Sequence, residues 1–155
     1  MATVVFPGRF QPFHNAHAMI LKKLLRDFDR VILVIGSSDL KDKDNPFSAR
    51  ARKKMIQAVL DPEKIPRKKC AFAFLPYAPD HSWVSVFLAR VPRKSFDAVF
   101  TNNPRVKKQL KRFGIPFVSS AMKNRSQLSG KKIRKFPKDW KTRVPRPVVN
   151  FLRKL

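Results

Sequence analysis

Short apolar runs typical of buried strands alternate with stretches of helical spacing along most of this chain. Residues 31–35 are apolar, mostly β-branched and followed by Gly36, as expected of a strand that is buried on both faces. The other predicted strands are residues 3–6, 71–75, 98–100 and 115–118, and the predicted helices are residues 14–28, 46–60, 82–90, 106–113, 129–135 and 146–152. This alternation predicts an α/β fold, a doubly wound parallel sheet of about five strands with helices on both faces.

The chain length bounds the domain organisation. We expect the 155 residues to form a single domain spanning residues 1–155, closed by a small helical extension over about residues 129–155. Residues 2–6 already fit a strand, which leaves no room for a signal peptide, and the longest apolar run, residues 70–75, is too short to span a bilayer. Cys70 is the only cysteine, so no internal disulfide can form. We therefore predict a cytoplasmic protein without membrane contact.

The charge of the chain is strongly unbalanced. Lys and Arg number 35 against 10 Asp and Glu, which gives a formal net charge of +25, and beyond Asp97 the only acidic side chain is Asp139. Such an excess attracts phosphate groups of any kind. A solvated basic surface and loose, non-specific contact with nucleic acid both fit this composition. The first is the simpler interpretation, because the basic residues are spread along the chain rather than gathered in a tail.

The segment after the first predicted strand carries the strongest indication of a binding site, because parallel sheets bind ligands at the carboxyl ends of their strands. Gly8 lets the backbone approach a ligand closely, and Arg9 adds a planar donor group that suits phosphate. His14 and His17 lie three residues apart in the first turn of a predicted helix, so their side chains share one face. That turn also offers free backbone N–H groups and the positive end of the helix dipole. The alternative is that one histidine caps the helix and the other packs.

Two further groups extend the predicted phosphate site. Arg52, on the second predicted helix, can hold pyrophosphate beside that loop; otherwise it is an exposed charge on a solvated helix face. Ser129 and Gly130 stand at the start of a predicted helix, where backbone donors can bind a phosphate or an adenine. Arg134 lies one turn further and can aim at the same ligand. The alternative for this segment is a capped, basic surface helix.

These motifs occur together in one family. The residues from Gly8 to His17 resemble the Gly-Arg-Phe-Gln-Pro-Phe-His-x-Gly-His signature of archaeal-type nicotinamide-mononucleotide adenylyltransferases, nucleotidyltransferases that carry a His-x-Gly-His motif on a Rossmann-like fold. The resemblance continues in order through Ile35-Gly36-Ser37-Ser38, Asn45-Pro46-Phe47-Ser48-Ala49 with Arg52 and Met55, Trp83-Val84, Asn102-Asn103-Pro104 with Val106, and Leu128-Ser129-Gly130 with Ile133-Arg134. The first and last of these motifs are specific, whereas the middle ones are weak when taken alone.

The resemblance implies transfer of the adenylyl group of ATP to nicotinamide mononucleotide, giving NAD and pyrophosphate. It implies that His17 contacts the α-phosphate, that His14 contacts the phosphate cluster and that Arg134 completes the catalytic set. The residues implied for ATP binding are Gly8, Arg9, Phe10, Gly36, Arg52, Ser129 and Gly130, and those implied for the mononucleotide are Trp83 and Asn103. We add Lys131 to the predicted ATP contacts from its own charge, since it departs from the family. In that family the position of Trp83 stacks on the nicotinamide ring, although a core tryptophan is the alternative. We expect Mg²⁺ to enter with ATP, because no carboxylate cluster with ligand spacing is present.

The sequence departs from the family at several positions. Ala16 replaces the glycine of His-x-Gly-His, and Lys131, in place of threonine, can add a phosphate contact. Asp80 stands three residues before Trp83, where the family commonly has asparagine. A carboxylate there can accept a hydrogen bond from a carboxamide but would repel a carboxylate. If Asp80 reaches the ring substituent as a further mononucleotide contact, the amide substrate should be preferred over nicotinate mononucleotide.

Two alternatives from other classes stay open at this stage. A related nucleotidyltransferase can use another phosphorylated acceptor, such as flavin mononucleotide, phosphopantetheine or a phosphorylated alcohol. A basic nucleic-acid-binding protein can keep the same fold without the activity; the charge favours it, whereas the intact His14, His17 and Arg134 oppose it. Members of the family often form multimers, but like-charged copies repel, so the sequence leaves a homo-oligomer undecided.

Overall fold

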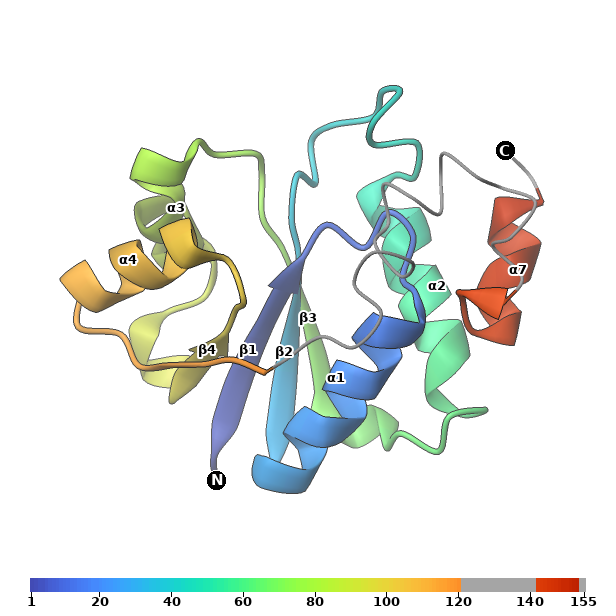
Figure 1. Ribbon diagram of the computed structural model, residues 1–155, viewed down its shortest axis with the longest axis horizontal. Helices are drawn as coiled ribbons and strands as arrows, with labels where there is room; N and C mark the ends of the chain where they lie inside the picture. The colour runs from blue at the N-terminus through green and yellow to red at the C-terminus, as the bar shows by residue number, and fades with distance from the viewer. Residues whose placement is uncertain (121–141, 154–155) are drawn as a thin grey trace.

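The computed structural model of the protein describes residues 1–120 and 142–153 (Figure 1). Its strands are β1 (Thr3–Gly8), β2 (Arg30–Ile35), β3 (Cys70–Phe74), β4 (Ala98–Phe100) and β5 (Phe117–Val118). Its helices are α1 (Asn15–Asp27), α2 (Ala49–Leu60), α3 (Trp83–Arg90), α4 (Pro104–Arg112) and α7 (Arg146–Leu152), with short 3₁₀ turns at Arg67–Lys69, Asp80–Ser82 and Arg93–Ser95. The predicted alternation of strands and helices is confirmed over the described part of the chain.

The strands form one five-stranded parallel sheet in the order β3-β2-β1-β4-β5. β1 lies at its centre, with Val5 opposite Ile32 of β2 on one side and opposite Val99 of β4 on the other. The chain winds outward from β1 through β2 to β3 and then crosses back to β4 and β5. The winding direction therefore reverses between β1 and β4, and doubly wound sheets bind ligands outside the carboxyl ends of their strands at such a point. The predicted fold class is confirmed.

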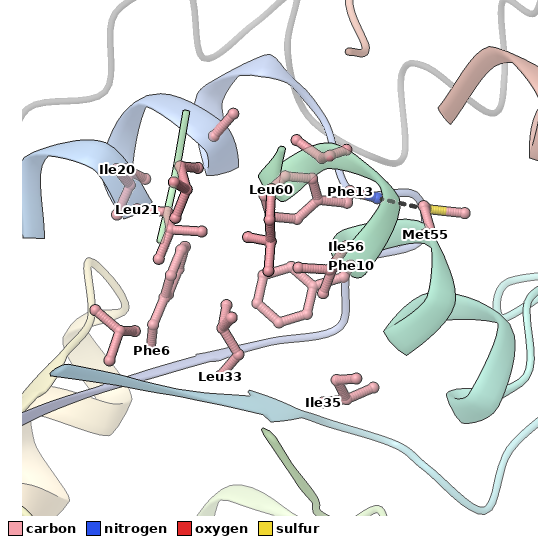
Figure 2. Close-up of a cluster of buried hydrophobic side chains, with 14 of the residues drawn as sticks. Phe6, Phe10, Phe13, Ile20, Leu21, Leu33, Ile35, Met55, Ile56 and Leu60 are labelled. Carbon is pink, nitrogen blue, oxygen red and sulfur yellow. Dashed lines mark hydrogen bonds between the residues drawn. The ribbon is translucent and has the colours of Figure 1, made fainter. Parts of the chain in front are cut away.

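Helices cover both faces of the sheet (Figure 1). α1, α2 and α7 lie on one face, and α3 and α4 lie on the other. The buried cluster on the first face includes Phe6, Leu21, Leu33, Ile56 and Val148 (Figure 2). The cluster on the second face includes Val5, Val34, Phe87, Val99 and Leu110. The adjacent residues Val5 and Phe6 contribute to different clusters because side chains alternate between the two faces of a strand.

Two elements, α2 and β5, begin two or three residues later than the sequence predicts, each for a local reason. α2 begins at Ala49, because the hydroxyl of Ser48 accepts a hydrogen bond from the N–H of Ala51 at 3.1 Å and caps the helix there. β5 is limited to Phe117–Val118, since Pro116 has no N–H to donate to the strand pairing. Both differences leave the order of elements unchanged.

The predicted C-terminal extension is described only in part. The predicted helix over residues 129–135 lies outside the described residues. α7 has the predicted bounds and packs on α2, with Val148 and Leu152 in the first buried cluster. None of the described helices combines the length and the apolar content needed to cross a membrane.

Candidate active site

The loop that follows β1 is fixed by buried side chains. Phe10 adopts a left-handed backbone conformation with φ of 51°, and it is 1% exposed. Figure 2 shows the Phe10 and Phe13 rings inside the cluster between α2 and the sheet. The side-chain amide of Gln11 pairs with the backbone of Phe47, donating to its carbonyl at 2.9 Å and accepting from its N–H at 3.0 Å. The backbone N–H of Phe13 donates to Sδ of Met55 at 3.3 Å. These contacts hold the loop against α2.

The two predicted catalytic histidines form a stacked pair at the start of α1. His14 occupies the N-cap position, and His17 is the third residue of the helix. Their ring centroids are 3.6 Å apart and the rings are 14° from parallel, so the side chains share one face as the spacing predicts. The backbone N–H of His14 donates to Nδ1 of His17 at 3.2 Å. A neutral His17 therefore carries its proton on Nε2, which makes that atom a hydrogen-bond donor for a ligand.

Both imidazoles are uncharged in the folded protein at neutral pH. Burial lowers the pKa of His14 to about 3, and the pKa of His17 is lowered by burial and, to a smaller extent, by the charge of His14. His14 is 2% exposed. Its side chain faces the backbone N–H of His17, but its Nδ1 makes no hydrogen bond of ordinary geometry among the described residues. The ring of His17 packs against those of Phe6, Phe10 and Phe13. Aromatic neighbours thus fix the direction in which this pair presents its nitrogen atoms.

Arg52 projects from the first turn of α2 into the interior, where it is 0% exposed. Its guanidinium donates to four backbone carbonyl oxygens, those of Arg9 and Gly36 at 2.6 Å, Ser37 at 3.2 Å and Ser48 at 3.3 Å. Burial, with a smaller effect from Arg9, lowers the pKa of Arg52 to about 10, so the group keeps its charge at neutral pH. The guanidinium connects the loops after β1 and β2 to the start of α2.

A pocket of about 290 Å³ opens at the carboxyl ends of the strands, and its lining includes Gly8, Arg9, Gly36, Trp83 and Asn103. Trp83 stacks on Phe87 with ring centroids 5.1 Å apart and 15° from parallel, so one face of the indole is covered while the side chain still lines the pocket. The exposed guanidinium of Arg9 donates to the carbonyl of Asp44 at 3.1 Å and brings a positive charge to the pocket wall. The pocket combines a basic group, backbone at two glycines that a ligand can approach closely, and an aromatic surface. This combination suits a nucleotide.

The sequence model of the cytidylyltransferase-like family matches residues 5–136 of this chain. The chain belongs to that family. A relative in Methanocorpusculum labreanum, named nicotinamide-nucleotide adenylyltransferase, is 37% identical over 96% of this chain and 88% of its own length. A relative of the same name in Thermoplasma volcanium is 36% identical over 96% of this chain and 84% of its own length.

A crystal structure supports the fold of this cytidylyltransferase-like chain. The structure of a bifunctional NMN adenylyltransferase/ADP ribose pyrophosphatase from Francisella tularensis superposes with a TM-score of 0.81 at 22% sequence identity. The superposition covers 99% of this chain and 49% of the other, so this chain spans about half the length of the bifunctional protein. At 22% sequence identity, the superposition shows that the two proteins share a fold and no more.

In this member of the cytidylyltransferase-like family, five of the predicted ligand residues meet at the pocket: Gly8, Arg9, Gly36, Trp83 and Asn103. Asn103 also caps α4, since its Oδ1 accepts from the N–H of Arg105 at 2.9 Å. His14 and His17 follow the same loop as Arg9 but are not part of the lining of this pocket. The structure therefore separates this pocket from the histidine pair, which follows it along the chain.

The structure shows where three further predicted site residues lie. The ring of Phe10, a residue predicted to bind ATP, lies in the core because the left-handed backbone turns it inward, so any contact of Phe10 with a ligand would have to come from its backbone. The Arg52 guanidinium, expected at pyrophosphate, is held inward by the carbonyl oxygens that it binds. Asp80, expected at the ring substituent, is outside the pocket lining and pairs with Arg105 at 3.2 Å, because the opposite charge on α4 attracts it. The predicted residues Ser129, Gly130, Lys131 and Arg134 lie outside the described part of the chain.

Sequence reasoning missed two residues that organise this site, Gln11 and Asn15. The backbone N–H of Asn15 donates to the carbonyl of Arg143 at 2.9 Å, and its Nδ2 donates to the carbonyl of Thr142 at 3.1 Å. Asn15 thereby ties the first turn of α1 to the segment that leads into α7. Asn15 and Thr142 are 127 positions apart. A contact over that separation leaves no local signal, so only the position of Asn15 between the two histidines hinted at a role.

The two glycines of the pocket provide a matched pair of variants. A Cβ at Gly8 would lie 2.8 Å from atoms of the buried Phe10 ring, whereas a Cβ at Gly36 would meet nothing closer than a carbonyl oxygen at 3.5 Å. We expect Gly8→Ala to lower the free energy of unfolding by about 1–3 kcal/mol through overpacking. Gly36→Ala should change it by less than about 0.5 kcal/mol. Denaturant unfolding of both variants measures the difference, and equal losses would contradict the view that Gly8 makes room for the Phe10 ring.

Proposed function

We propose that this chain transfers the adenylyl group of ATP to nicotinamide mononucleotide, forming NAD and releasing pyrophosphate. The observation that carries this proposal is the pocket in which Gly8, Arg9 and Gly36 adjoin the indole of Trp83. Such a lining supplies donors for phosphate and a flat aromatic face for a base or a pyridine ring. Support also comes from the archaeal relatives named nicotinamide-nucleotide adenylyltransferase, at 37% and 36% identity.

The proposed nucleophile is the 5′-phosphate of nicotinamide mononucleotide. A phosphate monoester has a second pKa of about 6 and is mostly ionised at neutral pH, so it needs no general base. One of its oxygens forms a bond to the α-phosphorus of ATP. The bond from that phosphorus to the oxygen bridging to the β-phosphate breaks, and pyrophosphate leaves with the electron pair. The protein must therefore bring two polyanions together and stabilise the charge that builds up on the leaving group.

Three described side chains suit that task in the proposed mechanism. Arg9 attracts the phosphates from the pocket wall, the Nε2–H of His17 donates to the α-phosphate, and His14 contacts the phosphate cluster. Donors whose direction is already fixed by packing need no reorganisation when charge develops, which is the main source of their effect. The proposed ATP contacts beyond the described residues are Ser129, Gly130, Lys131 and Arg134, the last with a catalytic role.

The proposed mononucleotide contacts are Trp83 and Asn103. Trp83 presents to the nicotinamide ring the indole face that Phe87 leaves uncovered, and a cationic pyridinium on indole contributes about 1–2 kcal/mol. Asn103 uses its Oδ1 to cap α4, and its Nδ2 makes no hydrogen bond among the described residues. Asp80 pairs with Arg105, so it offers no contact to the carboxamide of the substrate. We therefore propose the amide rather than the acid form of the mononucleotide from the names of the relatives alone.

We propose that a divalent cation, Mg²⁺, enters as part of the ATP complex. Within residues 1–120 and 142–153, no group of three His, Cys, Asp or Glu side chains is placed to hold a metal ion. The phosphate oxygens of ATP are hard ligands of the kind that Mg²⁺ prefers. In this scheme the cation is brought by the substrate rather than held by the protein beforehand.

A panel of acceptors tests the proposed function. The protein is incubated with ATP, Mg²⁺ and, in separate reactions, nicotinamide mononucleotide, nicotinate mononucleotide, flavin mononucleotide or phosphopantetheine, and pyrophosphate and the dinucleotide are measured. We expect NAD and pyrophosphate from nicotinamide mononucleotide. Turnover of flavin mononucleotide or phosphopantetheine alone would assign the chain to a related nucleotidyltransferase. No pyrophosphate with any acceptor would overturn the proposal.

Trp83→Leu separates the two substrate sites in the same assay. Loss of the indole face is expected to raise the KM for nicotinamide mononucleotide by roughly tenfold, which corresponds to the stacking energy. The KM for ATP should stay within about twofold and serves as the internal control. An equal rise in both KM values would remove Trp83 from the mononucleotide subsite.

The basic surface remains without an assigned partner. α4 alone carries five basic side chains and no acidic one among its nine residues, namely Arg105, Lys107, Lys108, Lys111 and Arg112. Non-specific contact with nucleic acid through this surface stays a prediction, and a strong salt dependence of RNA binding would support it. Formation of a homo-oligomer and a cytoplasmic location also stay predictions.

A further inference from the structure

Arg52 is a buried cation whose partners are all backbone atoms. It is 0% exposed, and no ion pair with an Asp or Glu is formed by it within the described residues. A buried charge is costly unless hydrogen bonds satisfy it. Its guanidinium binds the carbonyl oxygens of Arg9, Gly36 and Ser37, and all three residues line the pocket. The arginine therefore lies behind the pocket wall rather than in it.

The position of Arg52 sets the direction of two peptide groups. A trans peptide points its N–H opposite to its C=O. Arg52 draws the carbonyl oxygens of Arg9 and Gly36 inward at 2.6 Å, so the next N–H groups, those of Phe10 and Ser37, point away from it. Neither N–H makes a hydrogen bond among the described residues. Phe10 and Ser37 have left-handed φ values of 51° and 47°, which only support from surrounding groups makes tolerable for residues with a side chain.

We propose that Arg52 is a positioning residue that orients the Arg9–Phe10 and Gly36–Ser37 peptides so that the N–H groups of Phe10 and Ser37 bind a phosphate group. The two peptides follow adjacent strands, β1 and β2, and Arg9, Gly36 and Ser37 line the pocket. Backbone N–H groups of neighbouring turns that face the same way can form a concavity for an anion. The positive charge of the guanidinium lies directly behind these peptides and adds to the attraction. The positioning role of Arg52 rests on the proposed adenylyl transfer in one respect only, the identity of the anion, which would be a phosphate of ATP or of the mononucleotide.

The geometry requires a guanidinium and not merely a positive charge. Arginine presents five N–H donors in a planar fork, whereas the lysine ammonium offers three donors from one point. Arg52→Lys keeps the charge but cannot hold the carbonyl oxygens of Arg9, Gly36, Ser37 and Ser48 together. The conservative variant thus removes peptide orientation while leaving the electrostatic attraction in place.

Inorganic pyrophosphate is the probe for a direct test by amide NMR spectroscopy. In the wild-type protein, the Phe10 and Ser37 amide resonances should shift as pyrophosphate binds. In Arg52→Lys, the affinity for pyrophosphate should fall by at least about tenfold and these two shifts should disappear. Arg50→Lys, an exposed arginine on the same helix, is the matched control and should keep both the affinity and the shifts.

Each outcome decides between the alternatives. Wild-type Phe10 and Ser37 amides that do not respond to saturating pyrophosphate would overturn the proposal, even if Arg52→Lys does not fold. A folded Arg52→Lys with wild-type affinity would overturn it as well. Arg52-dependent binding of pyrophosphate by a protein that forms no dinucleotide would remove the proposed function and leave the role of Arg52 in place. Formation of NAD without these amide shifts would support the proposed function and remove the role of Arg52.

Discussion

Replacing His17 with alanine is expected to lower kcat by roughly a hundredfold or more, while the Kd for ATP changes by less than about threefold. The backbone N–H of His14 donates a hydrogen bond to Nδ1 of His17, so the imidazole of His17 can donate only through Nε2–H. A donor aimed at the α-phosphate acts mainly where charge is redistributed in the transition state, and its loss therefore lowers kcat rather than binding. Steady-state kinetics together with equilibrium nucleotide binding measure the two effects separately.

The packing of the His17 ring requires its own control, because the ring lies against Phe6, Phe10 and Phe13. His17→Phe keeps an aromatic ring but has no N–H, so it should lose turnover as completely as His17→Ala while unfolding at a temperature closer to that of the wild type. His81→Ala changes an exposed histidine and should keep its turnover. Full activity in His17→Phe would leave the ring only a packing role, and equal losses of turnover and binding would assign it to ground-state binding.

The order and type of the elements could be predicted because each carries a local signature. The apolar run of β2 ending at Gly36 and the helical spacing that begins at His14 need no information from distant residues. The shared face of His14 and His17 follows in the same way from their separation of three. Local patterns also determine the exceptions, since a capping serine, Ser48, fixes the start of α2.

The direction of the site's side chains could not be predicted, because it depends on partners far along the chain. Arg52 turns inward to carbonyl groups that lie 43, 16 and 15 positions away. Asp80 pairs with Arg105, 25 positions on, and Gln11 binds the backbone of Phe47, 36 positions on. The motifs contain five residues of the pocket lining, namely Gly8, Arg9, Gly36, Trp83 and Asn103. Only the assembled sheet shows which motif residues face the pocket and which hold its wall from behind.

Lowering the pH of the ligand-free protein from about 7 to about 4 is expected to lower its free energy of unfolding through the stacked histidine pair. An unfolded histidine has a pKa of about 6.5, whereas burial lowers the pKa of His14 to about 3 and also lowers that of His17. Between these values the unfolded chain binds protons that the folded chain excludes, so acid favours unfolding. The contribution of His14 to stability is fully present above about pH 6.5 and falls towards about pH 3, by roughly 1 kcal/mol per pH unit. His17 lowers stability in the same direction.

Denaturant unfolding across this pH range isolates the contribution of the pair. The double variant His14→Asn/His17→Phe has neither titrating ring and should show a shallower pH dependence than the wild type, with His81→Gln as the control for the loss of an exposed histidine. Inorganic tripolyphosphate should flatten the wild-type dependence, because an anion beside the imidazoles favours their protonated form and raises the pKa in the folded state. Identical slopes in the wild type and the double variant would contradict the view that both histidines are neutral in the folded protein. A slope that tripolyphosphate leaves unchanged would mean that the triphosphate binds away from the histidines.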